Sequence, residues 1–194
     1  MHDFPSDAMP DETALFAGGC FWSIEAVFQH VRGVTGTEPG YVWMEPGVPG
    51  KPSAERHLAQ RMEVVRVHWN PSVITLEKML DIFFATTSPT LVPWDSITEL
   101  SPNRSAIFVC DQGQREVAEQ HLMDVKVSGR FEDPVHTQVL DMPPFELAEM
   151  GEQDFYLNHP RDGFCTSIVK PKIDKLRAHF ASHYRKAVRS ATVA

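Results

Sequence analysis

The stretch "TALFAGGCFWSIEAVFQHVRG" (residues 13–33) determines how the fold begins. Its first six residues, 13–18, are a short apolar run that ends in glycine, which is typical of a buried strand. From Trp22 onward the apolar residues recur at positions 24, 27, 28 and 31, which is helical spacing, and Gly33 closes the helix. The stretch therefore predicts a strand that leads into a helix through a tight glycine turn.

The rest of the chain alternates between strand and helix patterns. We expect strands at 34–43, 62–69, 104–110 and 136–142, helices at 75–87, 112–129 and from Ile168 onward, and a helical turn within 143–160. Loops rich in proline separate these elements at 44–54 and 88–103. This order indicates an α/β (α+β) two-layer sandwich with a split β-α-β, ferredoxin-like core and an extra C-terminal helix and coil.

Length and composition are those of one globular domain. The chain has 194 residues, of which 42% are hydrophobic and 23% charged, and it contains no internal repeat or evident linker. We expect residues 1–12 to be a disordered leader and residues 13–194 a single domain. The leader is acidic and has no basic segment before an apolar core, so we do not interpret it as a secretory signal.

Charge and cysteine content narrow the classes of partner. The net charge of −8 argues against nucleic acid, and no apolar run approaches the ~20 residues that span a bilayer. Three cysteines without a CxxC pair, and histidines without ligand spacing, argue against a disulfide scaffold and a metal site, and favour a reducing, cytoplasmic setting. The seven Lys and Arg residues between 170 and 189 form either a solvated helix face or a docking surface for an acidic partner.

Cys20 lies between the first strand and the first helix. Free N–H groups and the positive end of the dipole at a helix start favour an anion, so we expect the pKa of Cys20 to be lowered. Since the thiolate is the nucleophilic form, this would make Cys20 reactive, with Phe21 and Trp22 as an apolar wall beside it. The alternative is a cysteine that merely packs at the end of a strand. A papain-like Cys–His pair with His159 is a weaker alternative, because the C-G-x-C-W pattern and an orienting Asn are missing.

The sequence also resembles a known family. The segment "GGCFWSIEAVFQHVRGVTGTEPGY" (18–41) resembles the signature of A-type peptide methionine sulfoxide reductases, GCFW-x-x-E-x-x-F-x-x-x-x-G-V. Further segments that resemble the family are 62–84, 103–108, 128–149 and 152–165. Together these similarities extend over about residues 13–180, which is nearly the whole chain.

The resemblance implies a reaction and a role for each matching residue. The family reduces methionine-S-sulfoxide, free or in oxidised proteins, through a cysteine sulfenic acid. Cys20 would be the nucleophile, Phe21 and Trp22 would hold the methyl group, and Glu63 would donate a proton to the sulfoxide oxygen. Cys165 would then form a disulfide with Cys20. The resemblance implies no metal and no bound cofactor. It implies an external thiol reductant, thioredoxin, that reduces the disulfide. We expect the enzyme to be a monomer.

The sequence departs from the family where the sulfoxide oxygen should bind. Two family tyrosines are replaced, by Ala54 and Asn103, and a family aspartate has at best Asp95 in its place. Without these two hydroxyls the enzyme would be weak, unless Asn103, Tyr41 or a water molecule donates instead.

Other matching positions carry substitutions as well. Glu152 stands for a family histidine, and Phe155 and Phe164 stand for tyrosines. A catalytically impaired member that binds methionine or its sulfoxide without turnover is therefore the alternative function, and a peroxide-sensing thiol is a third. Cys110 matches no family motif, and we expect it to be a packing residue.

Overall fold

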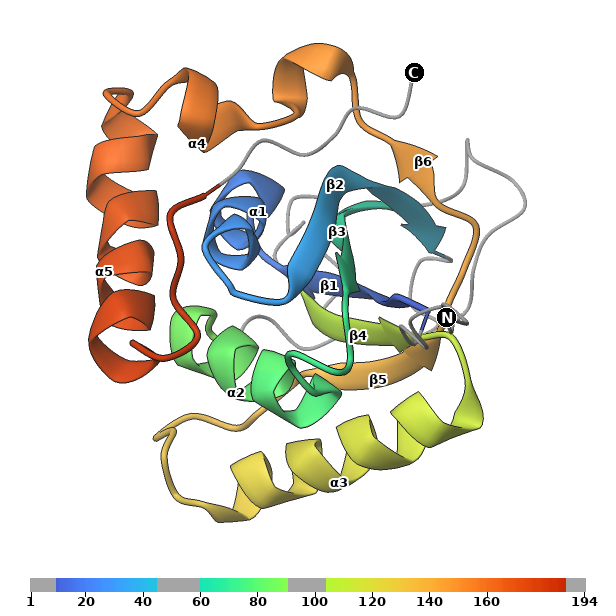
Figure 1. The fold of residues 1–194 in the computed structure, drawn as a ribbon. Helices are drawn as coiled ribbons and strands as arrows, with labels where there is room; N and C mark the ends of the chain where they lie inside the picture. The colour runs from blue at the N-terminus through green and yellow to red at the C-terminus, as the bar shows by residue number, and fades with distance from the viewer. Residues whose placement is uncertain (1–9, 45–59, 91–103, 188–194) are drawn as a thin grey trace, which may run out of the picture.

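A six-stranded sheet with helices against one face organises the protein (Figure 1). The computed structural model describes residues 10–44, 60–90 and 104–187. The strand order is β5-β4-β1-β3-β2-β6, and every neighbouring pair is antiparallel except β4 and β5. The expected leader lies mostly outside the described residues, and the sheet begins at Glu12, one residue before the expected boundary of the domain.

The four central strands follow the ferredoxin-like arrangement that the sequence predicts. The chain runs β1, α1, β2, β3, α2, β4, and β3 lies between β1 and β2 and is antiparallel to both. β4 pairs with the other edge of β1, so the order β4-β1-β3-β2 is that of a split β-α-β core. The bounds are β1 (Glu12–Gly18), α1 (Phe21–Gln29), β2 (Val34–Met44), β3 (Gln60–Trp69), α2 (Leu76–Thr86) and β4 (Ser105–Val109).

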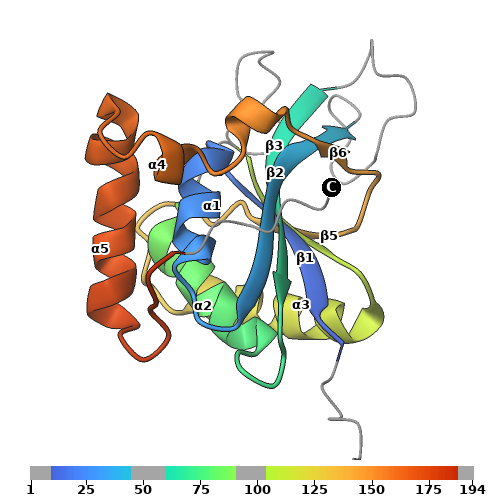
Figure 2. The same cartoon turned by 45° about the horizontal axis from the view of Figure 1, so that its top comes forward.

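The C-terminal half extends this core on both edges of the sheet. After β4, helix α3 connects to β5, which pairs in parallel with β4, and the two-residue strand β6 pairs with β2. Short helical segments then lead to α5 on the outer side of α1, away from the sheet (Figure 2). The bounds are α3 (Gln112–Val127), β5 (Gln138–Asp141), β6 (Glu146–Leu147), η2 (Met150–Glu152), α4 (Phe155–Asn158), η3 (Cys165–Val169) and α5 (Lys170–His179).

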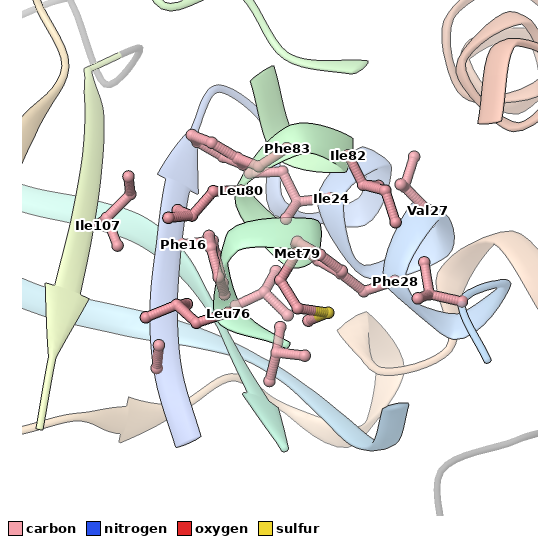
Figure 3. Packing of buried hydrophobic residues seen from close by; sticks show 14 of the residues in the cluster. Phe16, Ile24, Val27, Phe28, Leu76, Met79, Leu80, Ile82, Phe83 and Ile107 are labelled. Atoms are coloured by element: carbon pink, nitrogen blue, oxygen red, sulfur yellow. The ribbon is translucent and has the colours of Figure 1, made fainter. Parts of the chain in front are cut away.

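The main core lies between the sheet and the helices (Figure 3). Phe16 of β1 contacts Phe28 of α1 and Phe83 of α2, with ring centroids 4.8 and 5.4 Å apart. On the opposite face of the sheet, alternate residues of the same strands, such as Leu15 and Val64, form a second apolar cluster. Because β1 is buried on both faces, its sequence is a continuous apolar run rather than an alternating one.

The helix ends follow local capping chemistry. The Thr75 side chain accepts a hydrogen bond from the Lys78 N–H and so caps the start of α2. Helix α1 ends at Gln29, earlier than expected, and Gly33 follows in the left-handed conformation with φ of 93°. The C-terminal helix does not begin at Ile168: a π-helical segment, η3, precedes α5.

Candidate active site

Cys20 directly precedes the first residue of α1. Gly19 has a φ of 91°, which turns the chain from the strand toward the helix, and the Ser23 N–H donates to the Cys20 carbonyl oxygen over 3.1 Å. A Cβ atom at Gly18 would collide with the Thr87 side chain, so a glycine at position 18 permits close packing between β1 and the end of α2. The Cys20 side chain is half-buried, at the position that the sequence predicted.

Glu63 of β3 lies beside the same turn. The Phe21 N–H, the first amide of α1, donates to Glu63 Oε2 over 2.9 Å. The negative charge of Glu63 also contributes to raising the pKa of the Cys20 thiol. The structure therefore brings Cys20 and Glu63, which are far apart in sequence, to one place.

The thiol of Cys20 has a raised pKa, and the expected lowering was wrong in its net direction. Burial raises the pKa of Cys20 to about 11, and the charge of Glu63 adds to this effect. Hydrogen bonds from the Trp22 and Ser23 N–H groups lower this pKa, as expected for a helix start, and so does the charge of Lys172. These favourable contributions are smaller than the cost of burying a thiolate.

The two aromatic residues after Cys20 lie in different surroundings. Phe21 is only 2% exposed, and its ring centroid lies 5.4 Å from that of Tyr41 in the main core. Trp22 is half-buried and stacks on Phe155 of α4, with centroids 3.7 Å apart and planes 8° from parallel. The Phe164 ring also lies near Trp22, with centroids 6.0 Å apart and planes at 71°. The aromatic wall beside the thiol is therefore completed by the C-terminal segment.

Tyr41 of β2 lies opposite Glu63 in the β2–β3 pairing. Directly paired residues project to the same face of a sheet, so these two side chains are neighbours. The Tyr41 hydroxyl donates to the Glu152 carboxylate over 3.0 Å, and burial together with Glu152 raises the pKa of Tyr41 to about 12. Of the groups that the sequence offered as substitute oxygen donors, Tyr41 is thus close to Glu63. Ala54, Asn103 and Asp95 lie outside the described residues.

Glu25 of α1 fixes the start of α4 and was not selected from the sequence as a site residue. Its side chain is buried, and its Oε1 accepts a hydrogen bond from the Asp154 N–H over 2.9 Å. Gln29 donates to the Asp154 carboxylate over 2.6 Å, and Asp154 itself has a φ of 54°. Burial raises the pKa of Glu25 to about 8. The signal for this contact was the glutamate of the GCFW-x-x-E motif, three residues after Trp22.

Cys165 is buried beside α1 but away from Cys20. It packs against Ala26, Val169 and Ile173 in a separate apolar cluster. Ala26 is six residues after Cys20, or about 9 Å along a helix axis. All three cysteines are free, and no described interaction joins the Cys165 and Cys20 sulfurs. Burial, with a contribution from the Asp162 charge, raises the pKa of Cys165.

Cys110 is exposed, so the interpretation of this residue as a packing cysteine was wrong. It follows directly after β4, and its thiol donates to the Thr13 carbonyl oxygen over 3.1 Å. The apolar run of residues 104–110 did not reveal that the last side chain faces solvent.

Lys172 in the first turn of α5 is a further site residue that the sequence did not single out. Its Nζ atom donates to the Ser23 Oγ atom over 2.9 Å. In the sequence it is one of several cations between 170 and 189, and nothing distinguishes it from those that face solvent. Within the described ranges, no three His, Cys, Asp or Glu side chains gather closely enough to hold a metal ion.

A ferredoxin-like domain that holds a half-buried thiol beside a carboxylate falls in the class of thiol-dependent enzymes. The family model of peptide methionine sulfoxide reductase matches residues 12–184, and the chain belongs to this family. It is similar to the peptide methionine sulfoxide reductase MsrA of Ralstonia nicotianae, at 36% identity over 88% of this chain and 91% of the relative. It is also 34% identical to MsrA of Deinococcus radiodurans, over 90% of this chain and 84% of the relative.

Solved structures show that the fold is shared. Mxr1 from Saccharomyces cerevisiae in its reduced form matches with a TM-score of 0.59, at 24% identity, over 84% of this chain and 93% of that one. Methionine sulfoxide reductase A of Corynebacterium diphtheriae matches with a TM-score of 0.58, at 20% identity, over 80% of this chain and 78% of that one. The chain is therefore an oxidoreductase that reduces methionine sulfoxide with thiols, and the comparisons do not favour the catalytically impaired alternative.

Proposed function

We propose that the chain reduces methionine-S-sulfoxide, free or in oxidised proteins, with Cys20 as nucleophile and Glu63 as the proton carrier. The observation that carries this proposal is the shared helix start. The Phe21 N–H holds the Glu63 carboxylate at 2.9 Å, directly after the residue that bears the thiol. A carboxyl group next to both a thiol and the substrate is suited to general acid–base work.

Because the pKa of Cys20 is raised, Glu63 has two tasks, one after the other. Glu63 first takes the thiol proton, so the thiolate forms beside a neutral carboxyl group and the repulsion that helps raise its pKa is removed. The Cys20 sulfur then attacks the sulfoxide sulfur, while Glu63 returns the proton to the sulfoxide oxygen. The oxygen passes to Cys20 as a sulfenic acid and methionine leaves. The sulfoxide is reduced by two electrons and the thiol is oxidised by two, so the step balances without a metal or a bound cofactor.

Cys165 is the candidate for the second step. Its thiol would condense with the sulfenic acid of Cys20, releasing water and forming a disulfide, and an external dithiol such as thioredoxin would reduce that disulfide by exchange. Because Cys165 contacts Ala26 and not Cys20, the segment that carries it must rearrange first. Cys165 begins the π-helical segment η3, and π-helical turns are rare and concentrate at functional sites.

Tyr41 and the Trp22–Phe155 pair are the candidate substrate contacts. Tyr41 lies next to Glu63, where the oxygen would be bound. Its one hydroxyl proton is donated to Glu152, so Tyr41 would have to turn from Glu152 before it donates to the sulfoxide oxygen. Trp22, which is half-buried, would contact the methyl group, and the buried Phe21 would complete the apolar wall. Losing one such oxygen donor typically costs about 10²–10³ in rate, so Tyr41 bears on how active the enzyme is.

A coupled assay tests the proposal. Thioredoxin, thioredoxin reductase and a methionine-S-sulfoxide peptide should give continuous turnover with the intact protein and none with Cys20→Ser. The R epimer of the same peptide is the control substrate. Without a reductant, substrate should remove two thiols per molecule. A folded wild-type protein that binds the S epimer without losing thiols would contradict the proposal and support the binding-only alternative.

We also infer a cytoplasmic, monomeric enzyme that binds neither nucleic acid nor membrane. Among the described residues, no helix has the length and apolar character that crossing a bilayer requires. The net charge of −8 is unfavourable for binding phosphate backbones. Size-exclusion chromatography with light scattering tests the monomer, and a mass of about two chains would contradict it.

A further inference from the structure

A short chain of hydrogen bonds links Lys172 to the residue that carries the thiol. Lys172 Nζ donates to Ser23 Oγ over 2.9 Å, and Ser23 Oγ donates to the Cys20 carbonyl oxygen over 2.9 Å. Lys172 belongs to α5, which lies along the outer side of α1 (Figures 1 and 2). The C-terminal helix therefore brings a cation to the first turn of α1.

The environment of Lys172 is unfavourable for a cation unless an anion is nearby. Its side chain is largely withdrawn from solvent, and burial lowers its pKa. Among the described residues Lys172 forms no ion pair with a carboxylate, whereas its exposed neighbour Lys170 pairs with Asp174.

Cys20 is the group that offsets this cost once its thiol is ionised. The charge on Cys20 raises the pKa of Lys172, and the charge on Lys172 lowers the pKa of Cys20. The groups that shift the pKa of the Cys20 thiol are Glu63 from β3, the Trp22 and Ser23 N–H groups from α1, and Lys172 from α5. Lys172 is the full positive charge in this set, and it opposes the charge of Glu63.

We propose that Lys172 is a positioning residue for the reaction: its ammonium group stabilises the Cys20 thiolate and, through Ser23, fixes the start of α1. This inference rests on the proposed function of Cys20 as the nucleophile. It adds a C-terminal residue, outside the GCFW segment, to the groups that set thiol reactivity. The family resemblance assigned no role to this position.

The test measures the alkylation rate of Cys20 in the full chain, followed by peptide mass spectrometry so that Cys110 and Cys165 do not contribute. Lys172→Met removes the charge and keeps the length of the side chain. Below its pKa a thiol reacts in proportion to its thiolate fraction, so a rise of half to one pH unit in the pKa of Cys20 slows iodoacetamide about three- to tenfold. The slowing should be the same at every pH between 7 and 9.

Two comparisons separate a charge effect from a change in packing. Iodoacetate is an anion, so Lys172→Met should slow it more than it slows neutral iodoacetamide, and 1 M salt should shrink this difference. Lys172→Arg keeps the charge and should recover most of the rate. Lys175→Met removes an exposed cation of the same helix and should leave both rates within about 1.5-fold of wild type, which is the precision expected for a screened surface charge.

The outcomes are distinct from those of the reductase assay. Unchanged alkylation in Lys172→Met, equal slowing of both reagents, or an Arg variant as slow as the Met variant would each overturn the role of Lys172. If the alkylation pattern is as expected but the wild-type protein does not reduce the sulfoxide peptide, the proposed function fails and the electrostatic role of Lys172 stands. If both results are as expected, Lys172→Met should also lower sulfoxide turnover by a similar factor.

Discussion

Replacing Glu25 by Gln should make the stability of the protein less dependent on pH. Burial raises the pKa of Glu25 to about 8 from an ordinary value of 4.5, so the folded protein holds this carboxyl in its protonated form at neutral pH. Glu25 Oε2 and Gln29 Oε1 are both buried without a hydrogen-bond partner among the described residues. Residues four apart share a helix face, so a protonated Glu25 carboxyl group could donate a hydrogen bond to the Gln29 Oε1 atom.

The size and sign of the effect follow from linkage between protonation and folding. Between pH 4.5 and about 8 the folded state binds this proton and the unfolded state does not, so the free energy of unfolding falls as pH rises through that window. At about 1.4 kcal/mol per pH unit, the free energy of unfolding falls by roughly 4–5 kcal/mol across the whole window. Below pH 4.5 the contribution of Glu25 is fully present, and above pH 8 it is lost. Gln is neutral throughout and should not show this loss.

Urea unfolding followed by circular dichroism at pH 5, 6, 7 and 8 measures the effect. The free energy of unfolding of Glu25→Gln minus that of wild type should rise by about 4 kcal/mol from pH 5 to pH 8. Titrations of other groups occur in both proteins and cancel in this difference. Glu132→Gln, at an exposed carboxylate, is the control and should give a flat difference. A difference for Glu25→Gln that changes by less than about 1 kcal/mol would refute the argument that Glu25 is protonated.

Three other substitutions have distinct expected outcomes. Gly18→Ala places a methyl group against Thr87 and should reduce the free energy of unfolding by about 1–3 kcal/mol in urea titrations; a loss below 0.5 kcal/mol, roughly the size of a neutral surface change, would contradict the packing. Glu63→Gln should lower sulfoxide turnover about 10²–10⁴-fold but speed alkylation of Cys20, because the charge that raises the thiol pKa is removed; parallel changes in both rates would contradict its two tasks. Cys165→Ser should complete one turnover and leave a sulfenic acid on Cys20 that dimedone traps; continuous thioredoxin-dependent turnover would exclude Cys165 as the resolving residue.

The sequence predicted most of the fold because local signals and topology rules agree. The strand 13–18, the glycine turn and the spacing of residues 24–31 place β1 and α1 without ambiguity. The helical pattern of residues 75–87 places α2. The segment 143–160 was harder, because its structure depends on tertiary contacts: β6 exists through pairing with β2, and α4 is fixed by the buried Glu25. Such short elements have no periodicity of their own to detect.

The sequence predicted the site residues that belong to a recognisable motif. It did not predict the residues that tertiary packing brings to the site. The GCFW segment identified Cys20, and the resemblance identified Glu63. The stacking of Phe155 on Trp22 and the contact of Lys172 with Ser23 join residues more than a hundred positions apart, so neither can be seen in a linear pattern. The sequence also does not show how far a side chain is buried. The helix start suggested a lowered pKa for Cys20, but burial raises this pKa by more than the helix start lowers it.

The raised pKa of Cys20 also bears on two possible uses of the thiol. Peroxide-sensing cysteines are accessible and have a low pKa, because they must react as thiolates with any oxidant that reaches them. With a pKa of about 11, Cys20 is ionised in only about one molecule in ten thousand at pH 7. Such a thiol is nearly inert until a group beside it accepts its proton, and Glu63 is placed to do so when a sulfoxide oxygen is there to receive it. The site therefore favours a reductase that reacts with its own substrate over a sensor that reacts with peroxide.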